Sequence, residues 1–148
     1  MSDKLIKSRE APPRPSAMIE SLRGLGYSTA GALADIIDNS ISAKASKVDI
    51  KFFWQNKASY ISVLDDGNGM DDGELELAMH LGEKNPLDSR ESDDLGRFGL
   101  GLKTASFSQC RRLSVASKKH GHISCLRWDL DVLAASKTNS WMLLEGPD

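Results

Sequence analysis

The stretch LADIIDNS, residues 33–40, places polar side chains inside an apolar run. On a helix, Asp35 and Asn39 would lie one turn apart on the same face, with apolar side chains covering much of the remaining surface. Such a polar stripe is usually the solvent-facing side of an amphipathic helix. The alternative is that a carboxylate and an amide face a ligand. The rest of the chain bears on this choice.

The composition is that of an ordinary globular domain. The chain has 148 residues, of which 40% are hydrophobic and 27% are charged, so a single domain with an adequate core is expected. The formal net charge of −2 gives no overall basic footprint for nucleic acid, and no apolar run approaches the roughly 18 residues of a membrane helix. Cys110 and Cys125 match no metal or disulfide pattern. We therefore expect a cytoplasmic protein without a membrane partner.

Working outward from residues 33–40, the hydrophobic periodicity predicts helices separated by strand pairs. Residues 1–15 are polar and proline-rich, which predicts a flexible lead before a domain that spans 16–148. The expected helices cover 16–23, 29–43, 73–81 and 129–136, with another after the glycine-rich turn near 101. The expected strands cover 47–54, 59–64, 112–117, 122–128 and 141–144. This order predicts an α+β fold, a two-layer sandwich with helices on one face of a mixed β-sheet.

A second polar segment, LDDGNGM at 64–70, follows an expected strand. Glycines allow the backbone to turn sharply and to approach a ligand closely. A carboxylate at the end of a buried strand, such as Asp65, can accept a hydrogen bond from an amino group. An ordinary Asp-Gly turn is the alternative.

A third segment, GRFGLG at 96–101, precedes an expected helix. Glycines there expose backbone N–H groups that can converge on an anion, and Lys103 adds a point charge suited to phosphate. The segment is neither the dinucleotide fingerprint, which needs a βαβ unit, nor the Walker pattern, which needs Gly-Lys-Ser/Thr. Residues 82–95 before it are charged and lack a hydrophobic period. They predict a long loop of the kind that forms lids or disordered segments.

In their order and spacing, the three segments resemble the GHKL ATPase superfamily, which includes gyrase B subunits, heat-shock chaperone ATPases, MutL proteins and sensor histidine kinases. Its Bergerat fold carries a helix motif ending in Asn, DxGxG after a strand, a mobile lid, and GxxGxG before a helix. The resemblance spans roughly residues 16–145 and is greatest, at FGLGLK, to the MORC branch and its prokaryotic relatives. The family's later Gly-Thr strand does not appear by Asp148, so a fold truncated at its C-terminus is expected.

The resemblance implies roles for individual residues. Asn39 would bind the Mg²⁺ that bridges the phosphates, and Asp65 would accept a hydrogen bond from the adenine amino group. Asp35 stands where hydrolysing members carry Glu, so it would be the catalytic base, and Ser42 stands where many members have a second Asp. The other nucleotide-binding positions implied are Gly67, Gly69, Met70, Gly96, Phe98, Gly99, Leu100, Gly101, Lys103 and Thr104.

The implied activity is binding of ATP with Mg²⁺ under a mobile lid, with slow hydrolysis that drives a conformational or dimerisation cycle. Because Asp35 replaces Glu, a nucleotide-binding regulatory module without turnover is the alternative. A histidine-kinase phosphotransferase is disfavoured, since no upstream phosphoacceptor helix occurs in this chain. A nucleotide-dependent homodimer is the implied assembly, and nucleic acid follows only by family analogy. The basic residues at 111–112 and 118–120 fit a solvated hairpin better than a nucleic-acid contact.

Overall fold

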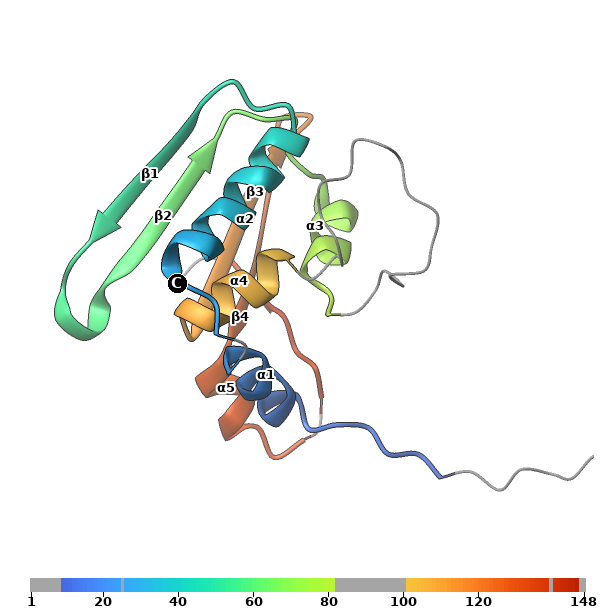
Figure 1. The fold of residues 1–148 in the computed structure, drawn as a ribbon. Coiled ribbons are helices and arrows are strands. Elements are labelled where there is room, and N and C mark those ends of the chain that lie inside the picture. Colours follow the sequence, from blue (N-terminus) through green and yellow to red (C-terminus); the bar gives the residue numbers. More distant parts are fainter. Residues whose placement is uncertain (1–8, 25, 82–100, 139, 147–148) are drawn as a thin grey trace, which may run out of the picture.

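The computed structural model describes residues 9–24, 26–81, 101–138 and 140–146 (Figure 1). In chain order its elements are α1 (Pro15–Arg23), α2 (Thr29–Ser42), β1 (Val48–Phe53), η1 (Asn56–Ala58), β2 (Tyr60–Asp65), α3 (Asp72–Met79), α4 (Gly101–Gln109), β3 (Arg112–Lys119), β4 (His122–Asp129), α5 (Leu130–Ala135) and β5 (Leu144–Glu145). The predicted α+β class is confirmed. The last strand is shorter than the predicted 141–144 and lies closer to the C-terminus.

The described strands form two antiparallel sheets, where the sequence predicted one mixed sheet. β1 pairs with β2 over 48–53 and 60–65. β3 pairs with β4 over 112–119 and 122–129, and β5 lies on the other edge of β4. The physical reason is connectivity: a parallel pair needs a crossover of about a dozen residues or more, whereas short turns join β1 to β2 and β3 to β4. These two pairs are therefore antiparallel, and β5 is also antiparallel to β4.

Helices cover one face of the β3–β4–β5 sheet, as the two-layer prediction requires. Along β3 the side chains alternate between half-buried and exposed, so one face is turned to the helices and the other to solvent. The core cluster draws on α1, α3, α4, β4 and α5, and consists of Ile19, Leu75, Met79, Phe107, Trp128, Leu130 and Leu133. The indole Nε1 of Trp128 also donates to the Met79 carbonyl at 2.9 Å. This contact holds the end of α3 against the sheet.

Side-chain caps fix where α2 and α3 begin. Ser28 Oγ accepts the N–H of Gly31 at 3.1 Å. Asp71 accepts the N–H of Glu74 while the Glu74 carboxylate accepts the N–H of Asp71, which is a capping box. Ser28 directly precedes the helix expected from residue 29, and Asp71 lies two residues before the helix expected from residue 73. Among the described residues, no helix is both long and apolar enough to span a membrane.

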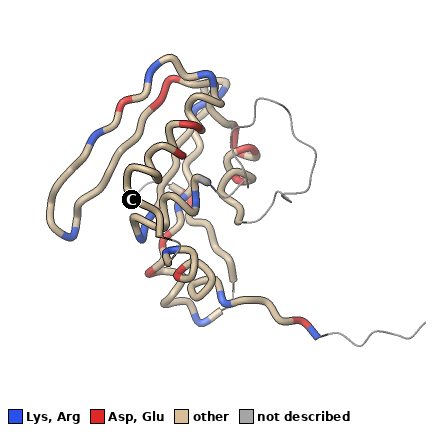
Figure 2. The backbone as a smooth tube through the Cα atoms, viewed as in Figure 1, with Lys and Arg blue, Asp and Glu red and all other residues tan. Residues whose placement is uncertain are grey.

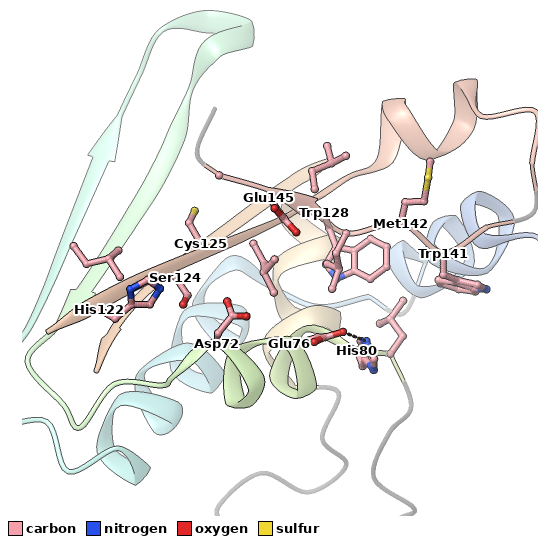
Figure 3. A pocket seen from close by; sticks show the side chains of 16 residues that line it. Asp72, Glu76, His80, His122, Ser124, Cys125, Trp128, Trp141, Met142 and Glu145 are labelled. Carbon is pink, nitrogen blue, oxygen red and sulfur yellow. Dashed lines mark ion pairs between the residues drawn. The ribbon is translucent and has the colours of Figure 1, made fainter. Parts of the chain in front are cut away.

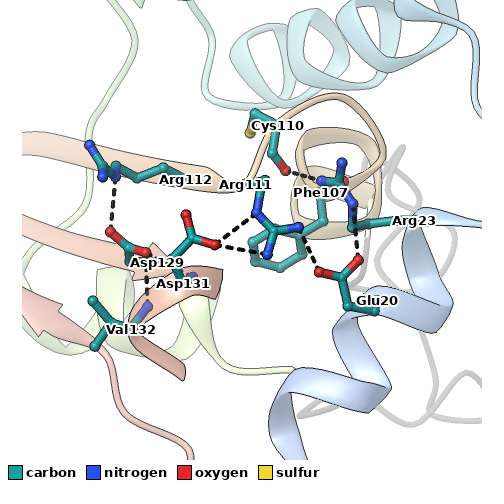
Figure 4. Close-up of polar contacts among 9 residues, drawn as sticks. All are labelled: Glu20, Arg23, Phe107, Cys110, Arg111, Arg112, Asp129, Asp131 and Val132. Atoms are coloured by element: carbon teal, nitrogen blue, oxygen red, sulfur yellow. Dashed lines mark hydrogen bonds and ion pairs between the residues drawn. The ribbon is translucent and has the colours of Figure 1, made fainter. Parts of the chain in front are cut away.

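An ion-pair network joins α1 to the segments around β3 and α5 (Figure 4). Arg111 lies between Glu20, at 2.6 Å, and Asp131, at 2.9 Å. Arg112 Nε donates to Asp129 Oδ2 at 2.9 Å. Most of these side chains are exposed, so their pairs contribute little to stability. The Asp129 side chain is only 6% exposed, so within this network its contacts matter most for stability.

Asp129 is also the N-cap of α5. Its Oδ1 accepts the N–H groups of Asp131, at 3.0 Å, and Val132, at 3.1 Å. Burial alone raises the pKa of Asp129, but these N–H groups and the charge of Arg112 outweigh it, so the pKa lies below its usual value. A carboxyl group whose pKa is depressed on folding adds stability above its unfolded pKa of about 3.9. That stability is lost as the pH falls through the folded pKa.

We expect Asp129→Asn to lower the free energy of unfolding by about 1–2 kcal/mol at pH 7, because the amide keeps the capping oxygen but loses the charge facing Arg112. The difference from the parent should shrink below about pH 4. Urea unfolding at pH 7 and at acidic pH measures both effects. Asp131→Asn, at an exposed position in the same helix, is the matched control and should cost less than about 0.5 kcal/mol. Equal losses in the two variants would contradict the special role of Asp129.

Candidate functional site

The end of α2 meets the end of β2 through one buried hydroxyl. Asp35 and Asn39 both lie on α2, one turn apart as predicted, with Asp35 half-buried and Asn39 exposed. Ser40, the next residue, is only 3% exposed, and its Oγ donates to Asp65 Oδ2 at 2.8 Å. This hydrogen bond brings the first two sequence motifs together.

The two adjacent aspartates at the end of β2 have different partners. Asp65 Oδ1 accepts the N–H of Gly67 at 3.0 Å, while its other oxygen contacts α2. Asp66 instead accepts the hydroxyl and N–H of Ser46 and the N–H of Lys47. These contacts, led by the Ser46 hydroxyl, lower the pKa of Asp66. Asp66 therefore holds the entry to β1, and Asp65 is the carboxylate available beside α2.

The glycines after Asp65 allow unusually close backbone packing. A Cβ added at Gly67 would lie 2.9 Å from both the Cβ and the carbonyl oxygen of Ala43. Gly69 has a φ of +67°, and a Cβ there would lie 2.1 Å from the carbonyl oxygen of Lys118. The N–H of Asn68 donates to the Ala43 carbonyl at 2.8 Å. Packing within the protein thus already requires both glycines, and their contact with nucleotide stays a prediction.

The third motif is described only from Gly101, where α4 begins. The predicted positions Gly96, Phe98, Gly99 and Leu100 and the predicted lid at 82–95 lie outside the described residues. Met70, predicted to contact nucleotide, donates its N–H to Ser117 Oγ at 2.7 Å and packs against the core. Thr104 is buried within α4.

α2 and α4 run roughly antiparallel (Figure 1). At one end, Thr29 Oγ1 donates to Gln109 Oε1 at 2.6 Å, and Gln109 Nε2 donates to the Tyr27 carbonyl at 3.0 Å. A helix rises about 1.5 Å per residue, so the start of α4 lies beside the C-terminal half of α2. The described parts of all three motifs therefore converge on one region.

Lys103 has a different environment from the one its motif suggests. It is 3% exposed, and its ammonium group donates to the carbonyls of Ala78, at 2.9 Å, and His80. The last carbonyls of a helix lack partners within it and attract cations. Lys103 thus joins the start of α4 to the end of α3. The predicted phosphate contact would require it to leave these carbonyls.

Asp35 has a partner that the sequence reasoning missed. The Tyr27 hydroxyl donates to Asp35 Oδ2 at 2.5 Å, and this hydrogen bond is the main cause of a raised pKa for Tyr27. One oxygen of the proposed base is therefore already engaged. Tyr27 precedes the helix in a non-periodic segment, so no pattern pointed to it. Ser40 could have been found from its place directly after Asn39.

A cavity of about 1120 Å³ lies apart from these motifs, between α3, β4 and residues 141–146 (Figure 3). Its lining includes polar side chains such as Glu76, His80 and His122 as well as apolar ones, and none of the predicted site residues that the structure describes lines it. In the described ranges, no group of three or more His, Cys, Asp or Glu side chains could hold a metal ion. The described residues that the sequence predicted to carry chemistry therefore lie outside this cavity.

The basic residues at 111–112 and 118–120 lie at opposite ends of β3, and three of the five pair with acidic side chains. Arg111 and Arg112 pair with acidic side chains, and Lys119 Nζ lies 2.7 Å from the Glu74 carboxylate. Figure 2 shows basic and acidic positions interspersed along the chain. These pairs favour the solvated hairpin over a nucleic-acid contact.

Comparison with known proteins identifies the class to which this fold and these motifs belong. A family model described as "Histidine kinase-, DNA gyrase B-, and HSP90-like ATPase" matches residues 27–146. The chain belongs to this family, which confirms the resemblance to GHKL ATPases.

Three relatives illustrate the relationship. The chain is 34% identical over 95 residues to "ATPase morc-1" of Caenorhabditis elegans, 31% over 101 residues to "ATPase MORC2" of Homo sapiens, and 34% over 93 residues to "DNA mismatch repair protein MutL" of Rhodospirillum rubrum. These alignments cover 64%, 65% and 62% of this chain, but only 11%, 10% and 15% of the respective relatives. MORC-like and prokaryotic relatives are therefore both present, as predicted.

Replacing Lys103 by Met should lower the free energy of unfolding by about 2–3 kcal/mol without nucleotide, because two helix-terminal carbonyls would lose a charged donor. Denaturant unfolding of the two proteins measures the difference. Lys118→Met, at an exposed position of β3, is the control and should cost less than about 0.5 kcal/mol. A Lys103→Met protein as stable as the parent would show that the contact with α3 is dispensable.

Proposed function

We propose that this chain binds ATP with Mg²⁺ where α2, the turn after β2 and the start of α4 converge, and that it hydrolyses ATP slowly. The observation that carries the proposal is the Asp65 carboxylate, oriented by Ser40 Oγ at 2.8 Å and the Gly67 N–H at 3.0 Å. A carboxylate has about four acceptor positions, so Asp65 retains capacity for the adenine amino group. Guanine presents a carbonyl oxygen at the equivalent ring position, and two acceptors would then face each other.

Asn39 is proposed as the protein's Mg²⁺ ligand. Its side chain is exposed at the end of α2, beside the residue that contacts Asp65. Mg²⁺ is commonly held by one or two protein oxygens together with substrate phosphates, and a single amide oxygen suits that mode. When bound, the ion would offset the negative charge of the phosphates.

Asp35 is proposed as the general base that takes a proton from the attacking water. It lies one helical turn before Asn39. Asp is shorter than Glu by one methylene, about 1.5 Å of reach, and misplacing a catalytic group by about 1 Å can cost on the order of 10²-fold in rate. Slow turnover follows from this difference in length.

The family resemblance extends this proposal. Residues 82–95 would close over the γ-phosphate, and closure would promote dimerisation, so that hydrolysis drives a conformational cycle. We also propose a cytoplasmic location, because the free thiols of Cys110 and Cys125 suit a reducing compartment.

A nucleotide-binding regulatory module without turnover is the second candidate. It is favoured by the Tyr27 hydroxyl, which occupies Asp35 Oδ2 at 2.5 Å. A carboxylate held in this way would serve to orient the tyrosine and the start of α2 instead of activating water.

Asp65→Asn should weaken ATP binding about tenfold to a hundredfold, because its amide can set a donor against the adenine amino group and leave a polar group unpaired. Titration with a fluorescent ATP analogue measures the affinity. Asp66→Asn is the matched control: among the described residues, the adjacent carboxylate contacts Ser46 and Lys47 at the entry to β1, so binding should change less than about threefold. Unchanged affinity in Asp65→Asn would refute the adenine contact, and equal losses would indicate damage to the turn instead.

Substitutions at Asp35 distinguish the two candidate functions. Asp35→Asn should lower steady-state phosphate release while ATP affinity is retained, and Asp35→Glu should raise release if reach is limiting. Asp38→Asn, at an exposed position of the same helix, controls for the change in charge. If Asp35→Asn releases phosphate as fast as the parent, Asp35 is not the base. The module without turnover would then be the better description.

A further inference from the structure

The β1–β2 hairpin is a two-stranded sheet, so among the described strands neither of its outer edges has a strand partner. Among the described strands, β1 pairs only with β2, and Figure 1 shows β1 as the outer strand, with β2 between it and the helices. An isolated two-stranded hairpin is marginally stable in water, and an unpaired edge presents N–H and C=O groups to another strand. The sequence of β1 determines what kind of strand could fit there.

The backbone of β1 has a definite inward and outward register. The Asp66 N–H donates to the Lys47 carbonyl at 3.3 Å, so position 47 directs its backbone groups toward β2. In an antiparallel ladder these directions alternate from residue to residue. The N–H and C=O groups of Val48, Ile50 and Phe52 therefore point to the open edge.

The charges of β1 are self-complementary about Ile50. If a second β1 strand lies antiparallel beside the first with Ile50 opposite Ile50, each Asp49 faces the Lys51 of the other copy. In this register the outward-facing residues form the hydrogen-bonded pairs, and Asp49 and Lys51 form the non-hydrogen-bonded pairs, in which side chains approach more closely. Figure 2 shows the alternation of basic and acidic positions along this strand.

The apolar side chains fit the same register. Val48 of one copy lies opposite Phe52 of the other, an aromatic and β-branched pair of the favourable kind. Phe52 is 47% exposed and stacks on Trp54, which is 81% exposed, with ring centroids 6.2 Å apart. Pairing of two hairpins would extend this partly exposed apolar face across four strands.

We propose that two copies of this chain associate through antiparallel pairing of their β1 strands, with a two-fold axis at Ile50. The contact is isologous, because the same edge serves both copies. It joins two hairpins into a four-stranded sheet without using the residues proposed to bind nucleotide. Self-association through this surface therefore does not require ATP.

The test uses single charge reversals in nucleotide-free protein. Asp49→Lys places lysines opposite lysines, and Lys51→Asp places aspartates opposite aspartates, so each variant alone should dimerise about tenfold more weakly or worse. In an equimolar mixture of the two variants, the Asp49→Lys chain has lysine at positions 49 and 51, and the Lys51→Asp chain has aspartate at both. Opposite charges therefore face each other at both charged pairs of the mixed dimer. Sedimentation velocity should show that the mixture regains the parental dimer.

Lys57→Asp controls for charge, because position 57 lies in the η1 turn, outside the paired register. It should dimerise like the parent, and mixing it with Asp49→Lys should not restore the weakened variant. A parent chain that stays monomeric up to its solubility limit overturns the proposal. So does a dimer that survives both single reversals, or a mixture of the two that stays weak. None of these results bears on ATP binding, which the variants at Asp65 test separately.

Discussion

The close approach of Gly69 to the carbonyl oxygen of Lys118 determines how the turn after β2 packs against α2 and the β3–β4 hairpin. A Cβ at position 69 would lie 2.1 Å from that oxygen, and the backbone there has a φ of +67°. The next N–H, of Met70, donates to Ser117 Oγ, while the residue before Gly69 donates to the end of α2. One short turn thus touches α2 and the β3–β4 hairpin, and the hairpin of β1 and β2 is oriented by it.

In the same turn, the neighbouring carboxylates of Asp65 and Asp66 have different roles: Asp66 has a structural role, and Asp65 has the proposed role in binding. Successive side chains of a strand point to opposite faces, so Asp65 reaches Ser40 on α2 while Asp66 reaches the backbone at Ser46. A single Asp could not make both contacts. The closely packed backbone beside Asp65 limits how far that carboxylate can move, which is the kind of rigidity that a binding site requires.

Local patterns predicted much of the fold and less of the site. Caps such as Ser28 and Asp71 act over three residues, so local patterns were enough to predict the starts of α2 and α3 to within a residue or two. Pairing between distant strands leaves no local pattern, so the separation into two sheets was not predicted. Lys103 also has partners that are distant in sequence. Its charge beside glycines predicted a contact with phosphate, but its ammonium group binds carbonyls at the end of α3. The partner of Asp35, Tyr27, lies across the start of a helix.

The placement of Lys103 has a consequence for the chain between α3 and α4. The ammonium group, two residues into α4, is bound to the carbonyl of His80, so the points where the chain leaves and re-enters the described fold are held close together. The entropy needed to close a loop grows only slowly with its length, by about 0.6 kcal/mol for each doubling. Related sequences could therefore lengthen or shorten this connection at little cost, while α3 and α4 keep their relative positions.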